Sequence, residues 1–472
     1  NKAAPNVKVR LTTSGPVYSC SSDNFAIRPQ GFSLASNATQ TGSSGAPVFR
    51  AGSDTFWLDA TALYGSTTTT HYTGIPKLNL NTGMTTTTLA HAGVLGSTAF
   101  EAAENGVARA GSLTYSEVGN FSLAQYAVYD DTFAEVDSVK GECTSSFSNT
   151  LSNSRYSCQF GSSAAGAFGR FVPDHFRVSA EVDNACTDEE HTYMGQPIPL
   201  STAIVAQAEN AANGVTQNYA GAYAPGTIAF GAENGDDGTN LSSRLTFSTN
   251  GGWASGVYTL TSVNGTFKRP GTNVADATWG SFESLNVGLT VNDNFVSTVT
   301  KVKDADMNPE AAGGSVFTYK EFTGSPLNIR FGRLSLQNAA GSELLALPMP
   351  LTAEYWNGGA WVVNTADSCT ALTAPTVGNG LTLNLANSGT TAATLNNPLV
   401  SGDAGFTLSA PGVTHGGFAD VVITSTPAWL KFNWDGLDQG DDGDLFDDNP
   451  SARGTFGIFR GNNNFIYTRE LY

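Results

Sequence analysis

An internal repeat constrains the fold of this chain more than any other feature of its sequence. The run FAIRPQGFSL from Phe25 and the run RFVPDHFRVS from Arg170 place a proline, an aromatic and an aliphatic residue at the same spacing. Farther along, HYTG from His71 matches NYAG from Asn218 at nearly the same distance from the proline. Repetition on this scale predicts tandem modules of one fold.

Each copy of the repeat predicts β-strands. The runs GNFSL from Gly119 and GVYTL from Gly256 place a turn glycine before an aromatic and an aliphatic residue at period two, as in an immunoglobulin-like strand. The stretch from Ser284 to Val291 also alternates and lacks helical period. Only 14% of the residues are charged, and Gly, Ser, Thr and Asn are abundant. We therefore predict an all-β fold of tandem immunoglobulin-like β-sandwich modules.

The repeat also predicts where the modules lie. A length of 472 residues suits about three domains of ordinary size. We place the first module at residues 25–168 and the second at 169–320, after a segment 1–24 that we expect to be the end of a preceding segment. Residues 321–472 do not show the repeat clearly, but their strand patterns predict a third, β-rich module.

Five cysteines predict a disulfide-containing, exported protein. Cys143 and Cys158 enclose a short Ser/Asn-rich segment that could hardly pack a core, and a bridge around a loop of about 15 residues contributes roughly 3 kcal/mol. The second expected pair is Cys186 with Cys369. Cys20 is then left unpaired within this chain or joined to a cysteine outside it. The cysteines form no CxxC pair and have no histidine at zinc-finger spacing, which argues against a zinc site.

The charge of the chain excludes one class of partner. Its formal net charge is −18, and nucleic acid attracts proteins through Lys and Arg, so a nucleic-acid-binding role is excluded. The sequence contains no run of about 18 apolar residues that could span a membrane. Its first residues lack the apolar core of a signal peptide, which leaves open a processed or trimmed piece.

Several longer runs resemble one family. They are CSSDNFAIRP from Cys20, TYSEVGNF from Thr114, FGRFVPDHF from Phe168, TYMGQP from Thr192, FGRLSLQNAAGSELLALPMPLTAEYWNG from Phe331, DSCT from Asp367 and PSARGTFGIFRGNNNFIYTRELY from Pro450. With these runs the chain resembles the MshQ-like family, which is encoded with mannose-sensitive haemagglutinin type IV pili. The resemblance implies a minor pilus or biogenesis component at the bacterial surface, and it carries over no catalytic residues.

The chain offers little for catalysis. The string GSSGAP from Gly42 resembles the nucleophile loop of trypsin-like enzymes, but Ser43 stands where that loop has aspartate and no histidine precedes it. A turn between strands explains the string better. The sequence has no G-x-S-x-G elbow and no H-E-x-x-H motif, and its five histidines are isolated from one another. We expect that this chain is not an enzyme.

One acidic loop, from Asp435 to Asn449, suggests a metal site. Calcium takes six to eight hard oxygen ligands, and a glycine-rich loop with many carboxylates can supply them. The order of an EF-hand is not met. The alternative is a solvated acidic turn, because Asp, Gly and Asn favour turns for conformational reasons alone; a second acidic turn, residues 233–238, has fewer ligands. The expected calcium ligands are Asp435, Asp438, Asp441, Asp444 and Asp447.

Aromatic residues suggest a binding surface. Tyr355, Trp356 and Trp361 bracket Asn357–Gly359, a natural hairpin tip, where they could contact a glycan or a protein partner. A core role suits Trp356 or Trp361 equally well, because alternate strand residues point inward.

Three functions compete for this chain. The first is an extracellular pilus-associated or cell-surface adhesive or structural protein without catalytic activity, whose partners are pilus or surface proteins and glycans. The second is a self-assembling subunit of an extracellular filament, sheath or matrix, which would bind copies of itself through sheet edges. The third, which the sequence favours least, is a secreted hydrolase that would need a pocket with convergent titratable groups.

Overall fold

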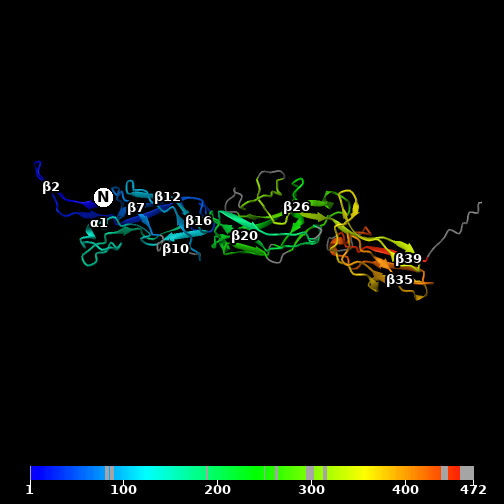
Figure 1. The fold of residues 1–472 in the computed structure, drawn as a ribbon. Helices are drawn as coiled ribbons and strands as arrows, with labels where there is room; N and C mark the ends of the chain where they lie inside the picture. The colour runs from blue at the N-terminus through cyan, green and yellow to red at the C-terminus, as the bar shows by residue number, and fades with distance from the viewer. Residues whose placement is uncertain are drawn as a thin grey trace, which may run out of the picture.

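The computed structural model describes residues 2–79, 84–85, 90–187, 190–248, 250–260, 264–293, 302–311, 316–436 and 445–457. The described residues form a nearly all-β structure, and the predicted all-β fold of tandem immunoglobulin-like β-sandwich modules is confirmed. Figure 1 shows three β-rich bodies in a row, with the first strands at one end and the last described strand at the other. Among the described residues no helix is long and apolar enough to cross a membrane.

The first module comprises strands β5 to β16 in three sheets, ordered β11-β12-β7-β5 with β8 beside β7, β10-β13-β16-β6, and β15-β14-β9. Buried and partly exposed residues alternate along its strands. In β7, Phe56, Leu58 and Ala60 are buried in the core, whereas the residues between them are partly exposed. The elements are β5 (Gly31–Ser36), β6 (Phe49–Arg50), β7 (Phe56–Tyr64), β8 (Thr67–Thr68), β9 (Lys77–Leu78), β10 (Met84–Thr85), β11 (Leu95–Gly96), β12 (Val107–Tyr115), β13 (Gly119–Leu123), β14 (Val128–Asp130), α1 (Ala134–Asp137), β15 (Phe160–Gly161) and β16 (Ala165–Val172).

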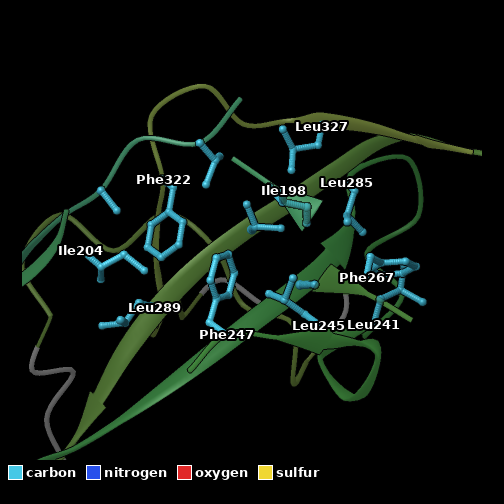
Figure 2. Close-up of a cluster of buried hydrophobic side chains, with 14 of the residues drawn as sticks. Ile198, Ile204, Leu241, Leu245, Phe247, Phe267, Leu285, Leu289, Phe322 and Leu327 are labelled. Carbon is cyan, nitrogen blue, oxygen red and sulfur yellow. The ribbon is translucent and has the colours of Figure 1, made fainter. Parts of the chain in front are cut away.

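The second module comprises β17 to β28, in sheets ordered β17-β20-β24-β23, β18-β28-β26-β21 with β27 beside β26, and β19-β25-β22. Figure 2 shows its core, where Ile204, Phe247, Leu285 and Leu289 gather between the strands. The elements are β17 (His175–Ser179), β18 (Thr192–Tyr193), β19 (Pro197–Ile198), β20 (Ile204–Glu209), η1 (Gly221–Tyr223), β21 (Thr227–Asn234), η2 (Ser242–Arg244), β22 (Leu245–Thr246), β23 (Trp253–Ala254), β24 (Val257–Leu260), β25 (Gly265–Phe267), η3 (Ala277–Trp279), β26 (Phe282–Asn292), β27 (Lys320–Glu321) and β28 (Leu327–Arg330).

The third module comprises β29 to β39, in sheets ordered β29-β32-β33, β30-β39-β38-β35-β34 and β31-β37-β36. Its core includes Leu351, Phe406 and Phe456, and it also takes in Tyr193 from the second module. The elements are β29 (Gly332–Leu336), β30 (Ala339–Gly341), β31 (Leu347–Pro348), β32 (Leu351–Trp356), β33 (Trp361–Val363), β34 (Thr376–Val377), β35 (Gly380–Leu385), η4 (Ala386–Ser388), β36 (Ala393–Thr394), β37 (Thr407–Leu408), β38 (Gly417–Val422), η5 (Ala428–Leu430) and β39 (Ser451–Phe456).

The repeated tyrosines have the same role in the first two modules. The hydroxyl of Tyr72 donates a hydrogen bond of 2.6 Å to Asp130, and that of Tyr219 donates one of 3.2 Å to Asp293. Both tyrosines are buried. Burial raises the pKa of each phenol, and the neighbouring aspartate raises it further, so both remain protonated donors.

Short linkers connect the modules. Only Pro173 and Asp174 separate β16 of the first module from β17 of the second, and only Phe331 separates β28 of the second from β29 of the third. Strand β16 runs past the boundary predicted at residue 168, and β27 lies across the boundary predicted at residue 320. The predicted module boundaries stay predictions.

A ribbon of paired strands precedes the first module. Strand β1 (Ala4–Val7) pairs with β4 (Phe25–Ile27), and β2 (Arg10–Thr12) pairs with β3 (Tyr18–Cys20). The β2–β3 hairpin points away from the first module in Figure 1. Its two strands are exposed along their whole length, including Cys20, which carries a free thiol.

Candidate functional site

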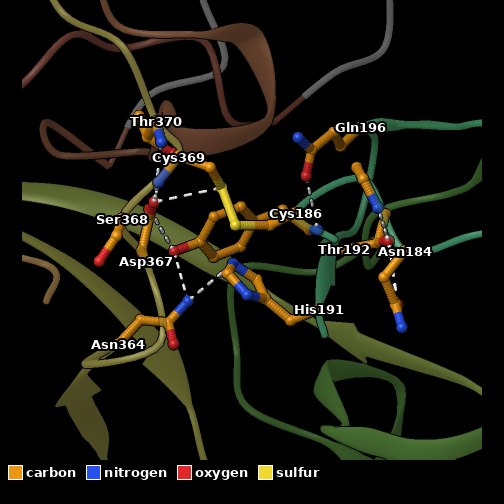
Figure 3. Close-up of a disulfide and its surroundings, with 12 residues drawn as sticks. Asn184, Cys186, His191, Thr192, Gln196, Asn364, Asp367, Ser368, Cys369 and Thr370 are labelled. Atoms are coloured by element: carbon orange, nitrogen blue, oxygen red, sulfur yellow. Dashed lines mark hydrogen bonds between the residues drawn. A yellow bond between two sulfur atoms is a disulfide. The ribbon is translucent and has the colours of Figure 1, made fainter. Parts of the chain in front are cut away.

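The second and third modules are joined by a disulfide. Cys186, in the loop before β18, is bonded to Cys369, in the loop after β33, and their Cα atoms are 5.9 Å apart. Figure 3 shows this bond at the boundary between the two modules. His191 lies beside both sulfur atoms. This is no metal-binding arrangement, because both sulfur atoms are used in the disulfide and neither is a thiolate.

A buried hydrogen-bond network surrounds this disulfide. The Tyr193 hydroxyl donates to Asp367 Oδ2 at 2.8 Å, and it accepts from Asn364 Nδ2 at 2.6 Å. The same amide nitrogen lies 3.2 Å from His191 Nε2, and the amide oxygen accepts from Arg330. Tyr193 and His191 come from the second module, whereas Asn364 and Asp367 come from the third, so these bonds join the modules (Figure 3). Burial raises the pKa of Tyr193 strongly, with the Asp367 charge adding to the effect.

A glycine allows Tyr193 to enter the third module. A Cβ atom on Gly332 would lie 2.3 Å from the Tyr193 ring and 2.8 Å from Leu430 Cδ2. Only a residue without a side chain leaves room for this contact. The first residue of β29 is thus fitted to a tyrosine from the preceding module.

The other side of this junction is an aromatic cluster. The linker residue Phe331 is fully buried, and its ring centroid lies 5.0 Å from that of Trp279 and 5.4 Å from that of Trp361. Trp356 lies 5.2 Å from Trp279. These are the distances of stacked and edge-on aromatic pairs. Phe432 and Phe446 complete the cluster.

The structure therefore places the three predicted binding aromatics at the junction. Trp356 and Trp361 are partly buried in the cluster. Tyr355 is also partly buried, and the Arg330 guanidinium lies 4.6 Å from its ring centroid. The core alternative for the two tryptophans matches their position. The core that contains these tryptophans, however, is formed by two modules together, and sequence alternation alone could not indicate this.

The first and second modules meet through hydrogen bonds. The Glu117 carboxylate, 7% exposed, accepts from the backbone N–H of Gln217 at 3.0 Å and of Asn218 at 3.1 Å. Asn218 Nδ2 donates to the carbonyls of His91 at 2.7 Å and Val118 at 3.2 Å, and its Oδ1 accepts from His91 N at 3.1 Å. Burial raises the pKa of Glu117, although the N–H donors oppose the rise.

Charged side chains extend this junction around the linker. Ser53 of the first module donates to Asp174 at 2.5 Å. His175 lies 2.9 Å from Asp174 and 3.0 Å from Glu209, which is fully buried and also binds Arg177. Burial raises the pKa of Asp174, but hydrogen bonds from His175 and Ser53 outweigh it and lower that pKa.

This Ser-Asp-His-Glu arrangement is unlike a catalytic triad. In a triad the serine hydroxyl bonds the histidine, which then accepts its proton. Here the hydroxyl of Ser53 bonds a carboxylate, and both ring nitrogens of His175 face carboxylates. The trypsin-like string also has a structural role, because Ser43 O accepts a hydrogen bond from Arg170. Both groups of residues hold the chain in place.

The predicted calcium loop is described only at its two ends. Asp438, Asp441 and Asp444 lie outside the described residues. Asp435 is exposed and its N–H donates to Asp448, while Asp447 is partly buried. The site stays a prediction. In the second acidic turn, Asp237 accepts hydrogen bonds from the amide of Asn234 and the N–H of Thr239, as in an ordinary turn.

The structure also joins Cys143 to Cys158, with Cα atoms 5.4 Å apart. Both expected cysteine pairs are thus present. Sequence reasoning missed the residues that bond across the junctions, among them Glu117, Tyr193 and Asp367. One signal could have identified them, since they lie within the runs TYSEVGNF, TYMGQP and DSCT that carry the family resemblance.

Comparison with known proteins gives the following similarities. No curated protein matches the chain. Similar solved structures include the Escherichia coli adhesin FdeC, at 11% identity and TM-score 0.33 over 90% of this chain and 96% of that one. An I-band fragment of titin has 8% identity and TM-score 0.27 over 90% and 96%. Domains 4–9 of surface layer protein SbsC have 10% identity and TM-score 0.17 over 86% and 43%. None of these TM-scores is high enough to support a functional argument.

Two family models match the chain. The third domain of DUF6701 matches residues 146–319, and the fourth domain of DUF6701 matches residues 330–471. The fourth-domain match begins next to the Phe331 linker. The third-domain match begins inside the first module, ahead of β16, the strand that leads directly into β17. The chain therefore carries the third and fourth domains of the DUF6701 family.

Proposed function

We propose that this chain is a force-bearing stalk segment of an exported surface protein. The observation that carries the proposal is the Cys186–Cys369 disulfide, which spans 183 residues of sequence. When tension acts on the two ends of the chain, the covalent path runs through this bond and bypasses β18 to β33. The residues between Cys186 and Cys369, which include β18 to β33, therefore cannot be extended while the bond is intact.

Several features support an extracellular stalk. Two disulfides suit an oxidising compartment outside the cytosol. Linkers of two residues and one residue leave little freedom between neighbouring modules. The resemblance to MshQ-like proteins favours a pilus-associated place at the bacterial surface, with pilus or surface proteins as partners. A stalk of this kind needs no catalytic residues.

Single-molecule stretching of the whole chain tests the proposal. Bypassing 183 residues should shorten the fully extended oxidised chain by roughly 600 Å relative to the reduced chain, at about 3.4 Å per residue. Without any reductant, Cys186→Ala with Cys369→Ala should extend to the reduced length less only the 15-residue loop that Cys143–Cys158 still closes. The Cys143→Ala, Cys158→Ala pair is the matched control and should change the length by less than a tenth as much. Equal lengths for oxidised and reduced chains would refute the force-bearing role.

The amino-terminal ribbon favours a second candidate function, a self-assembling filament subunit. Leu11 is 71% exposed and Val17 is 68% exposed, and both strands of the β2–β3 hairpin are open to pairing. Exposed strand edges readily add strands from other chains. Sedimentation of the chain over a hundredfold range of concentration tests this function. Assembly that Leu11→Asp abolishes would support a filament, whereas a monomer at every concentration would refute it.

A further inference from the structure

The first module contains an open groove that the stalk role does not use. Its volume is about 610 Å³, within the range of small-molecule sites. One wall is the chain segment from Ala26 to Gln30, which enters the module. The other wall is the loop closed by the Cys143–Cys158 disulfide. The loop closed by the disulfide therefore also forms one wall of a groove on the surface.

The walls of this groove are fixed before any ligand binds. The Arg28 guanidinium donates to Ser157 O at 2.6 Å and to Asn149 Oδ1 at 3.0 Å, so it ties one wall to the other. Asn149 Nδ2 returns a hydrogen bond of 2.9 Å to Gln30 O. Together with the disulfide, these bonds hold the loop against the entering chain. A site built in advance loses little conformational entropy on binding.

The exposed side chains in the groove are aromatic and polar. Tyr64 is 68% exposed and Tyr156 is 58% exposed, although aromatic rings of this size are usually covered. Glu142 and Arg155, both exposed, add one charge of each sign. Asn149 and Ser154 add neutral hydrogen-bonding groups. The exposed lining therefore combines two aromatic rings with balanced charge and several polar groups.

We propose that this groove binds a neutral saccharide. Tyrosine rings can pack against the C–H faces of sugar rings, and amide, hydroxyl and charged groups can bond their hydroxyls. Balanced charge argues against a polyanion, and a space of this size admits one or two sugar rings. The inference goes beyond the stalk role and is independent of it, since loss of sugar binding would leave the module junctions unchanged.

Binding assays on the whole oxidised chain test the groove. The probes are neutral tri- and tetrasaccharides of hexoses and N-acetylhexosamines, sulfated and sialylated glycans, and a peptide library, each titrated by calorimetry. We expect a neutral glycan to bind and Tyr156→Ala or Tyr64→Ala to weaken binding at least tenfold. Tyr18→Ala is the matched control, because Tyr18 is also 58% exposed but lies on the β2–β3 hairpin, and it should bind as the unaltered chain does.

Each other outcome overturns the proposal. Binding of only acidic glycans or only peptides would assign the wrong ligand class. Neutral-glycan binding that both groove variants retain would place the site elsewhere, and so would equal loss in Tyr18→Ala. If no neutral probe binds at millimolar concentration, the groove does not have this role. Unchanged thermal melting of the variants shows that they fold, since both side chains are on the surface.

Discussion

The two junctions in this rod hold their modules together with different chemistry. Between the first and second modules, Glu117 and Asn218 form hydrogen bonds to backbone groups, and charged side chains surround the linker. Between the second and third modules, a disulfide, buried Tyr193 and a cluster of aromatic rings do the same work. The first junction is polar and noncovalent, whereas the second is crosslinked and combines a buried hydrogen-bond network with an aromatic cluster.

Both linkers are short, so linker length does not by itself determine how two modules are held together. Polar contacts depend on the protonation of a few carboxylates, so the first junction should respond to pH. Aromatic burial is insensitive to protonation, but a disulfide depends on redox conditions. The two junctions should therefore fail under different conditions, and the following experiments perturb them one at a time.

Removing the inter-module disulfide should have the largest effect. In the chain-entropy view, a crosslink spanning 183 residues stabilises by roughly 5 kcal/mol, against about 3 kcal/mol for a 15-residue loop. Cys186→Ala with Cys369→Ala should thus lose more free energy of unfolding than Cys143→Ala with Cys158→Ala. Guanidinium denaturation measures both. An equal or smaller loss for the inter-module pair would contradict the asymmetry between the junctions.

Calcium should strengthen only the second junction. The acidic loop follows Phe432 and contains Phe446, both members of the aromatic cluster. If calcium binds only the folded form, then calcium at 100 times its Kd should add about 2.7 kcal/mol. Differential scanning calorimetry should show a rise in Tm that Asp441→Asn with Asp444→Asn abolishes. Identical melting in calcium and in chelator would leave a solvated acidic turn.

Asn218→Ala should loosen only the first junction. It removes three side-chain hydrogen bonds to His91 and Val118, and leaving buried backbone groups unpaired costs about 2 kcal/mol. Distance measurements between spin labels on the first and second modules should broaden, whereas those between the second and third should not. The exposed Asn250→Ala is the control. Unchanged distances at the first junction would show that these bonds do not hold it.

Lowering the pH should stabilise the first junction through Glu117 and, at lower pH, destabilise it through Asp174. The pKa of Glu117 is raised above its ordinary value of 4.5, so its contribution is present below that value and is lost as pH rises through the raised pKa. The pKa of Asp174 is lowered from 3.8, so its contribution is present above 3.8 and is lost as pH falls through the lowered pKa. Glu117→Gln should therefore flatten stability above pH 4.5, and Asp174→Asn should flatten it below pH 3.8. Urea titrations across pH 2 to 7 measure how the free energy of unfolding depends on pH. If both variants show the same pH dependence as the unaltered chain, neither carboxylate sets the response.

The sequence predicted the fold class because strand alternation and the tyrosine repeat are local signals. The runs around Tyr72 and Tyr219 needed no knowledge of distant contacts. Cysteine spacing likewise indicated the Cys143–Cys158 loop. These features depend on residues that lie close together along the chain or recur at a fixed spacing.

The junctions could not be predicted in the same way, because they depend on which surfaces meet. Alternation predicts that Trp356 and Trp361 can point inward, but it does not show that Trp279 of another module faces them. The carboxylate of Glu117 is about 100 residues from the N–H groups that it binds. The groove beside the Cys143–Cys158 loop was missed because the loop's own polar sequence is typical of any exposed turn.

The single residue between β28 and β29 has a further consequence. Because only Phe331 separates β28 from β29, the two modules can rotate relative to each other only about the backbone bonds of that residue. The Cys186–Cys369 disulfide attaches the modules to each other at a second point, away from these strands. Two attachment points at different places on the interface oppose rotation about the long axis as well as bending. A torque applied to the third module therefore also turns the second module. The two modules keep the same orientation relative to each other about the long axis.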